Sequence, residues 1–101
     1  MMSGDITRYV VTVNFHERTL TEINELNNHL TRAGFTLTLS DDDGKVHDLG
    51  INTFGLVSPQ SEDDIKALTV GLAETAIGQR PDVNIVTFEH WLQNNATNTT
   101  R

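Results

Sequence analysis

Short stretches of alternating apolar and polar residues run along the chain and predict strands that bury one face. The first covers residues 9–15, whose odd-numbered positions are Tyr, Val, Val and Phe. Further strands are predicted at 35–39, 46–57 and 83–88. The long third strand contains Gly50 and Gly55, which indicate a bulge or the close approach of another backbone.

Two stretches with apolar residues three and four positions apart predict helices. The first covers 20–33, and Thr19 with Glu22 forms a capping box at its start. The second begins after Ser61 and ends at Gly78, a residue type that commonly closes helices. The buried faces are expected to consist of Ile23, Leu26, Leu30 and Ala33 in the first helix, and of Ile65, Leu68, Leu72 and Ala76 in the second.

The resulting order, β-α-β-β-α-β, predicts an α+β sandwich with the ferredoxin-like arrangement. Both helices are expected on one face of a four-stranded antiparallel sheet with the strand order 4-1-3-2. The opposite face is expected to be free of helices and to carry Val10, Thr12, Thr36 and Thr38. We expect one domain over residues 1–93, followed by a disordered polar tail at 94–101.

Composition narrows the class of protein. With 101 residues, 37% of them hydrophobic, the chain is long enough for a single modest core. It contains no cysteine, which excludes disulfides and thiolate metal sites. No apolar run approaches the roughly 20 residues that span a bilayer, and the N-terminus lacks the pattern of a secretory signal. We therefore expect a cytoplasmic protein.

The charge balance disfavours extensive contact with nucleic acid. Acidic residues outnumber basic ones by 14 to 7, which gives a net charge of −7. Because phosphate neutralisation drives nucleic-acid affinity, any RNA contact must be local and sensitive to salt. The alternative is that the acidic charge only keeps a small protein soluble.

Several colinear segments resemble the GhoS family. They are Tyr-Val-Val-Thr-Val-Asn-Phe at 9–15, Asp-Gly at 43–44, Leu-Gly-Ile-Asn-Thr-Phe at 49–54, residues 61–68, and Asp-Val-Asn-Ile-Val-Thr-Phe at 82–88. The resemblance covers most of the chain. It implies a small antitoxin that acts as a sequence-selective endoribonuclease on the messenger RNA of a membrane toxin. It also implies a fold like that of the ferredoxin-like nucleases associated with CRISPR systems.

The chain departs from this family pattern at two places. The related sequences carry an acid near the end of the first strand, where this chain has Asn14. The family's first helix exposes arginines, whereas residues 25–29 have none and only Arg32 lies nearby. Neutral Asn is a poor substitute for a carboxylate on Mg²⁺. If the protein cleaves RNA, we therefore expect it to do so without a divalent metal, and we expect no cofactor.

Residues suited to metal-free cleavage are expected at one end of the predicted sheet. There the end of the first strand, the turn between the second and third strands, and the start of the fourth strand meet. This end collects His16, Glu17, Arg18, Lys45, His47, Arg80 and Asp82. Histidine, with a pKa of about 6.5, suits the base and the acid, and arginine suits the phosphate. We predict catalytic roles for His16, Arg18 and His47, and substrate binding by Arg80 and Lys45. The alternative is a group of solvated loop residues without a site.

Other functions remain open at this point. The main competitor is a non-catalytic ferredoxin-like module for dimerisation or protein binding, and a further one is a small-molecule sensor with a pocket at a dimer interface. The run Asp-Asp-Asp-Gly at 41–44 lacks the spacing of a calcium loop and indicates a turn. Trp91 suits either base stacking or coverage of a core edge. A homodimer is expected, because a helix-free face would leave Val10 uncovered.

Overall fold

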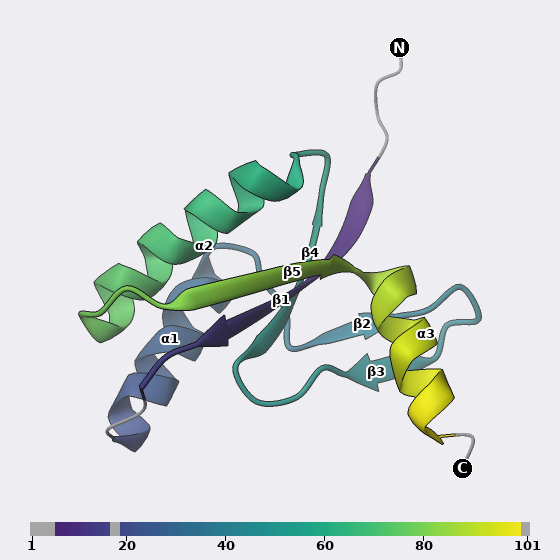
Figure 1. Ribbon diagram of the computed structural model, residues 1–101, viewed down its shortest axis with the longest axis horizontal. Coiled ribbons are helices and arrows are strands. Elements are labelled where there is room, and N and C mark those ends of the chain that lie inside the picture. The colour runs from purple at the N-terminus through teal and green to yellow at the C-terminus, as the bar shows by residue number, and fades with distance from the viewer. Residues whose placement is uncertain (1–5, 17–18, 100–101) are drawn as a thin grey trace.

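The computed structural model describes residues 6–16 and 19–99, with side chains up to position 94. Its elements, shown in Figure 1, are β1 (Thr7–Asn14), α1 (Leu20–Arg32), β2 (Thr38–Ser40), β3 (Val46–Asp48), β4 (Thr53–Ser58), α2 (Glu62–Ile77), β5 (Asp82–Thr87) and α3 (Phe88–Thr99). The α+β class is confirmed, with one strand and one helix more than expected within this described part. None of its helices is both long and apolar enough to cross a membrane.

The main sheet has three antiparallel strands in the order β4-β1-β5. In its register Tyr9 lies between Leu56 and Thr87 on the two neighbouring strands. The odd-numbered residues of β1 face α1 and α2, as their alternation predicts, and form the larger core with both helices. This core consists of Tyr9, Val11, Val13, Leu26, Leu30, Phe35, Phe54, Ile65, Ala73, Ile77 and Val83.

The predicted helix ends are confirmed. The Thr19 hydroxyl accepts the Glu22 N–H at 3.3 Å, and the Ser61 hydroxyl accepts the Asp64 N–H at 3.2 Å. Both bonds satisfy backbone donors that the first turn of a helix leaves without a partner. Gly78 closes α2 in the left-handed conformation, with φ of 70°.

The predicted buried face of α2 is confirmed at Ile65, is partly buried at Leu72 and Ala76, and is wrong at Leu68. The buried residues are Ile65, Thr69, Ala73 and Ile77, whereas Leu68 is 39% exposed. A polar residue occupies the face because the Thr69 hydroxyl donates to the Ile65 carbonyl at 2.8 Å, which satisfies it inside the core. The apolar spacing alone favoured the leucines.

The predicted four-stranded sheet is found in part, because three of its strands pair in the predicted order 4-1-3, here as β5-β1-β4, and the second predicted strand does not join them. The second predicted strand pairs with β4 only through an isolated bridge between Thr36 and Gly55. The chain then leaves this edge, and β2 pairs with β3 in a separate two-stranded sheet. The predicted strand 46–57 is divided by a turn in which Gly50 and Asn52 have φ of 103° and 56°. This turn allows the β2–β3 hairpin to fold back beneath the main sheet.

The hairpin and α3 cover the face that was expected to be free of helices. Val10, on that face, is only 2% exposed and packs with Leu39, Leu49 and Phe88 in a second, smaller core. Figure 1 shows α3 and the hairpin together near the C-terminal end of β5, away from α1. Because Val10 is covered, it no longer argues for a dimer. The backbone of α3 also continues to Thr99, beyond the predicted domain end at 93.

Gly55 makes room for the hairpin. A Cβ atom at this position would lie 2.6 Å from Cγ of Leu39 and 2.9 Å from both of its methyl carbons. These distances are well inside van der Waals contact, so any larger residue would displace the leucine. The close approach that the sequence indicated at this glycine is therefore to a side chain rather than to a backbone.

Replacing Gly55 by Ala is expected to lower the free energy of unfolding by about 1–3 kcal/mol, because overpacking displaces Leu39. The matched control is Gly71→Ala in α2, where an added Cβ meets nothing within 4 Å. This control should raise stability by about 0.5–1 kcal/mol through helix propensity. Urea denaturation at low protein concentration measures both. A G55A variant as stable as the wild type would contradict the close contact.

Candidate functional site

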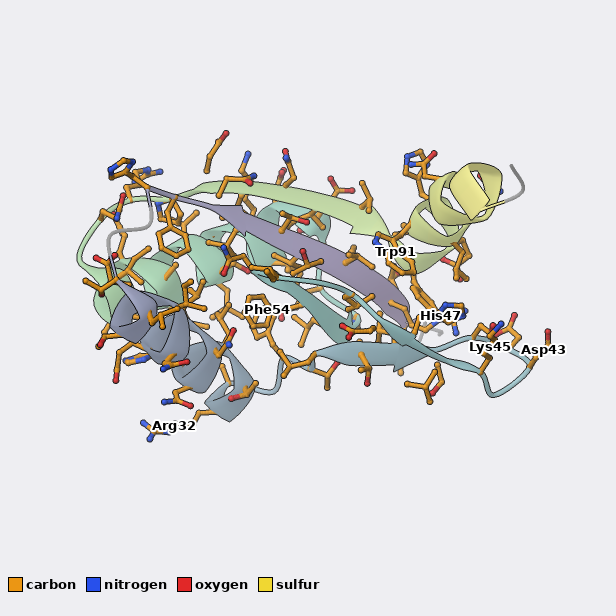
Figure 2. The ribbon with its side chains drawn as sticks, turned by 90° about the horizontal axis from the view of Figure 1, so that it is seen from below. Arg32, Asp43, Lys45, His47, Phe54 and Trp91 are labelled. Atoms are coloured by element: carbon orange, nitrogen blue, oxygen red, sulfur yellow. The ribbon has the colours of Figure 1, made fainter. Side chains whose placement is uncertain are left out.

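The inner face of the hairpin presents a paired histidine and aspartate. His47 lies on β3 opposite Leu39, and its Nε2 is 2.9 Å from Oδ2 of Asp41. The imidazole also packs edge-to-face against Phe88 and Trp91, with ring centroids 5.8 and 6.0 Å away. Figure 2 shows His47 beside Trp91, with Lys45 and Asp43 near the tip of the hairpin. Asp41 in the hairpin turn and the two aromatic side chains of α3 thus fix the ring from two sides.

Asp41 also holds the hairpin turn. Its Oδ1 accepts the backbone N–H groups of Asp43 and Lys45, each at 2.9 Å. The hydrogen bond with His47, followed by that from the Lys45 N–H, lowers the pKa of the Asp41 carboxyl below its ordinary value. The Asp41 carboxyl therefore keeps its negative charge. It lies in the turn that the sequence predicted at residues 41–44. Residues 6–16 and 19–99 contain no group of three or more His, Cys, Asp or Glu side chains suited to a metal ion.

Arg8 connects β1, the hairpin and α3, and the sequence analysis missed it. Its Nη1 donates to the Ser40 carbonyl at 3.0 Å, and its Nη2 pairs with Glu89 at 2.9 Å and with Asp42 at 3.3 Å. The guanidinium carbon lies 5.1 Å from the ring centroid of Phe88, which is a cation–π distance. The available signal was that Arg8 is the one charged residue of β1.

Trp91 closes the edge of the smaller core. It stacks on Phe88 with an interplanar angle of 22° and a centroid distance of 5.8 Å. The tryptophan is half-buried. Of the two roles that the sequence left open, coverage of a core edge describes its packing.

The structure divides the predicted cluster of site residues. Lys45 and His47 lie together at the hairpin. His16 lies at the other end of β1, where its carbonyl accepts a 2.9 Å hydrogen bond from Gln79, next to Arg80. Arg18 falls outside the described residues. The division arises because the hairpin folds back, so that its turn lies by Arg8 near the start of β1 rather than by the end of this strand.

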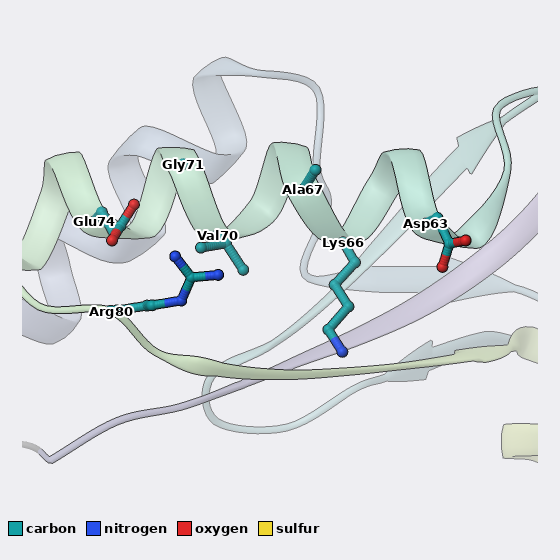
Figure 3. Close-up of a pocket in the computed structure, with 7 residues that line it drawn as sticks. All are labelled: Asp63, Lys66, Ala67, Val70, Gly71, Glu74 and Arg80. Carbon is teal, nitrogen blue, oxygen red and sulfur yellow. The ribbon is translucent and has the colours of Figure 1, made fainter.

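A groove of about 410 Å³ lies at the Arg80 end of the sheet, between α2 and the segment that leads into β5. Figure 3 shows Arg80 reaching toward Val70, while Lys66 extends from α2 toward the ribbon of β5. Charges of both signs line the groove. Its lining consists of Asp63, Lys66, Ala67, Val70, Gly71, Glu74 and Arg80.

Of the two groups of site residues, the one at the hairpin is better equipped for acid–base chemistry, and it consists of Asp41, Lys45 and His47. A carboxylate bonded to one imidazole nitrogen orients the ring, and this leaves Nδ1 as the second nitrogen for a substrate. Lys45 follows in the same turn and adds a positive charge for an anion. The opposite end offers His16 and Arg80 without a carboxylate bonded to the histidine ring among the residues that the structure describes.

Comparison with known proteins places the chain in a family. The family model described as "Endoribonuclease GhoS" matches residues 1–94. The "Uncharacterized protein YdiZ" of Escherichia coli strain K12 is 58% identical over 94 residues, which cover 93% of this chain and 98% of that protein. The same protein in strain O157:H7 matches equally. No solved structure gives a significant match. The chain therefore belongs to the endoribonuclease GhoS family.

Proposed function

We propose that this protein is an endoribonuclease that cleaves single-stranded RNA with His47 as its acid–base residue. The observation that carries the proposal is the bond of 2.9 Å between His47 and Asp41 beside Lys45, in a chain that belongs to an endoribonuclease family. Single strands are the proposed substrate because their nucleotides are open to attack, whereas an A-form duplex buries its bases.

The proposed reaction needs no metal. His47 removes the proton from a ribose 2′-hydroxyl, and the oxygen attacks the adjacent phosphorus. The bond from phosphorus to the 5′-oxygen breaks, which yields a 2′,3′-cyclic phosphate and a 5′-hydroxyl. The imidazolium returns its proton to the leaving oxygen directly or through water. Asp41 holds the ring during this exchange, and Lys45 binds a non-bridging phosphate oxygen.

The target is proposed to be the messenger RNA of a short membrane toxin, with the protein as its antitoxin. The support for this target is the family resemblance. A net charge of −7 opposes RNA, so binding is expected to be weak and strongly dependent on salt. The cheapest check is whether a gene for a short membrane protein adjoins this one. Its transcript is then the substrate to test.

Replacing His47 by Ala is expected to lower the cleavage rate by about 10²-fold or more, because the acid–base group is lost. Replacing it by Gln keeps a hydrogen-bonding side chain for Asp41 without a titrating group and should give a similar loss. The measurement is single-turnover cleavage of the transcript in EDTA, with the 5′-hydroxyl ends mapped. Circular dichroism shows whether each variant is folded.

The matched control is His16→Ala, which should retain cleavage because His16 lies at the other end of β1. The reverse result, with activity lost in His16→Ala and kept in both His47 variants, would place the site at the Arg80 end. Activity that disappears in EDTA would exclude the metal-free route. Folded wild-type protein that cleaves no RNA would favour the non-catalytic interaction module.

The Asp41 carboxylate should also make stability depend on pH. Its pKa is lower in the folded chain than in the unfolded chain, so its contribution is complete above the unfolded pKa and is lost as pH falls through the folded pKa. In Asp41→Asn the amide oxygen can still accept the turn N–H groups, but the charge is gone. Urea denaturation should show this variant less stable at neutral pH and equal to the wild type in strong acid. A stability difference that stays constant with pH would contradict the charged pair.

A further inference from the structure

The outer edge of β5 carries backbone groups that no described strand pairs. The Val13 N–H donates to the Asn52 carbonyl at 2.9 Å, so the odd-numbered residues of β1 bond toward β4. The even-numbered ones, such as Thr12 opposite Asn84, therefore bond toward β5. Alternation along β5 then directs the N–H and C=O groups of Val83 and Ile85, and the N–H of Thr87, away from the sheet. β5 is the last strand in the order β4-β1-β5.

The groove beside this edge contains a glycine that the single chain does not explain. Gly71 lies on the exposed side of α2, its φ is not positive, and an added Cβ would meet nothing within 4 Å. Glycine inside a helix costs about 1 kcal/mol relative to alanine. Ala67 lies one turn earlier on the same helix. Because both side chains are so small, another backbone could approach α2 closely at these two positions.

The charges of the groove are balanced and arranged symmetrically. Asp63 and Glu74 oppose Lys66 and Arg80, so the groove is neutral in a chain whose net charge is −7. Lys66 and Glu74 each lie four positions from Val70 along α2, in opposite directions. A two-fold axis beside Val70 would place every Lys66 against Glu74 of the partner subunit.

We propose that two copies of this chain associate through β5 and the groove side of α2. The two β5 edges pair antiparallel and join the two main sheets into one, while the α2 helices meet along Ala67, Val70 and Gly71. Such an interface is isologous, because the same surface serves on both subunits. The proposal does not depend on the activity assigned to His47.

A second copy fits this surface better than other extended partners. An RNA strand would bring its phosphates against Asp63 and Glu74 as well as against the two basic residues. A strongly charged peptide would likewise meet as much repulsion as attraction. Antiparallel self-pairing turns the mixed signs into attraction on both sides of the axis.

Charge exchange tests the proposed axis. Lys66→Glu alone or Glu74→Lys alone should raise the dimer dissociation constant by about 10-fold or more, because like charges then face each other twice. The double variant K66E/E74K restores opposite signs and should return to within about threefold of the wild type. Sedimentation equilibrium measures all four proteins. Wild-type protein that remains monomeric at about 1 mM, or a double variant as weak as the single ones, would overturn the proposal.

Amide exchange tests the strand pairing separately. The N–H groups of Val83, Ile85 and Thr87 should become protected as protein concentration rises, whereas those of Asn84 and Val86 should be protected at every concentration. Gly71→Leu, whose Cβ would meet nothing within 4 Å in the monomer, should abolish the concentration dependence while the fold persists. A dimer in which the three outer amides exchange rapidly would use another surface. Protection that requires added RNA would assign the edge to RNA. Either result overturns the proposal.

Discussion

Gly55 faces the Leu39 side chain beneath the main sheet, and the whole reverse side of the protein is built around this contact. Because position 55 has no Cβ, the hairpin can lie flat against β4 and bring Leu39 over Val10. The hairpin in turn holds His47 against Phe88 and Trp91. One missing methyl group thus determines where the histidine of the candidate site lies, although Gly55 has no chemistry of its own.

Arg8 and the smaller core contribute to this arrangement in different ways. The ion pairs of Arg8 are solvent-accessible, with its side chain 25% exposed and that of Asp42 92% exposed. Such pairs contribute little stability, about 0–1 kcal/mol each. Phe88 is fully buried, and burial of one large side chain contributes about 1.5–3 kcal/mol. Packing therefore holds α3 in place, and Arg8 sets the position of the hairpin relative to it.

The features that were predicted correctly from the sequence are those that depend on residues close together along the chain. The caps at Thr19 and Ser61 follow from contacts three positions apart, and the alternation of β1 identifies the larger core. The path of the hairpin depends on residues 39 and 55, which no local pattern connects. This missing link explains why the sequence grouped Lys45 and His47 with His16, whereas the structure places them at opposite ends of β1. Arg8 was missed for the same reason, since its partners lie far along the chain.

The two cores depend on different lengths of the chain. All buried members of the larger core belong to residues up to Val83, so a chain that ends with β5 already contains them. The smaller core requires Phe88, which comes after β5 and begins the last helix. A chain cut after β5 would therefore keep every buried residue of the larger core but would leave the hairpin uncovered. His47 acquires both of its aromatic neighbours only when the final segment is made.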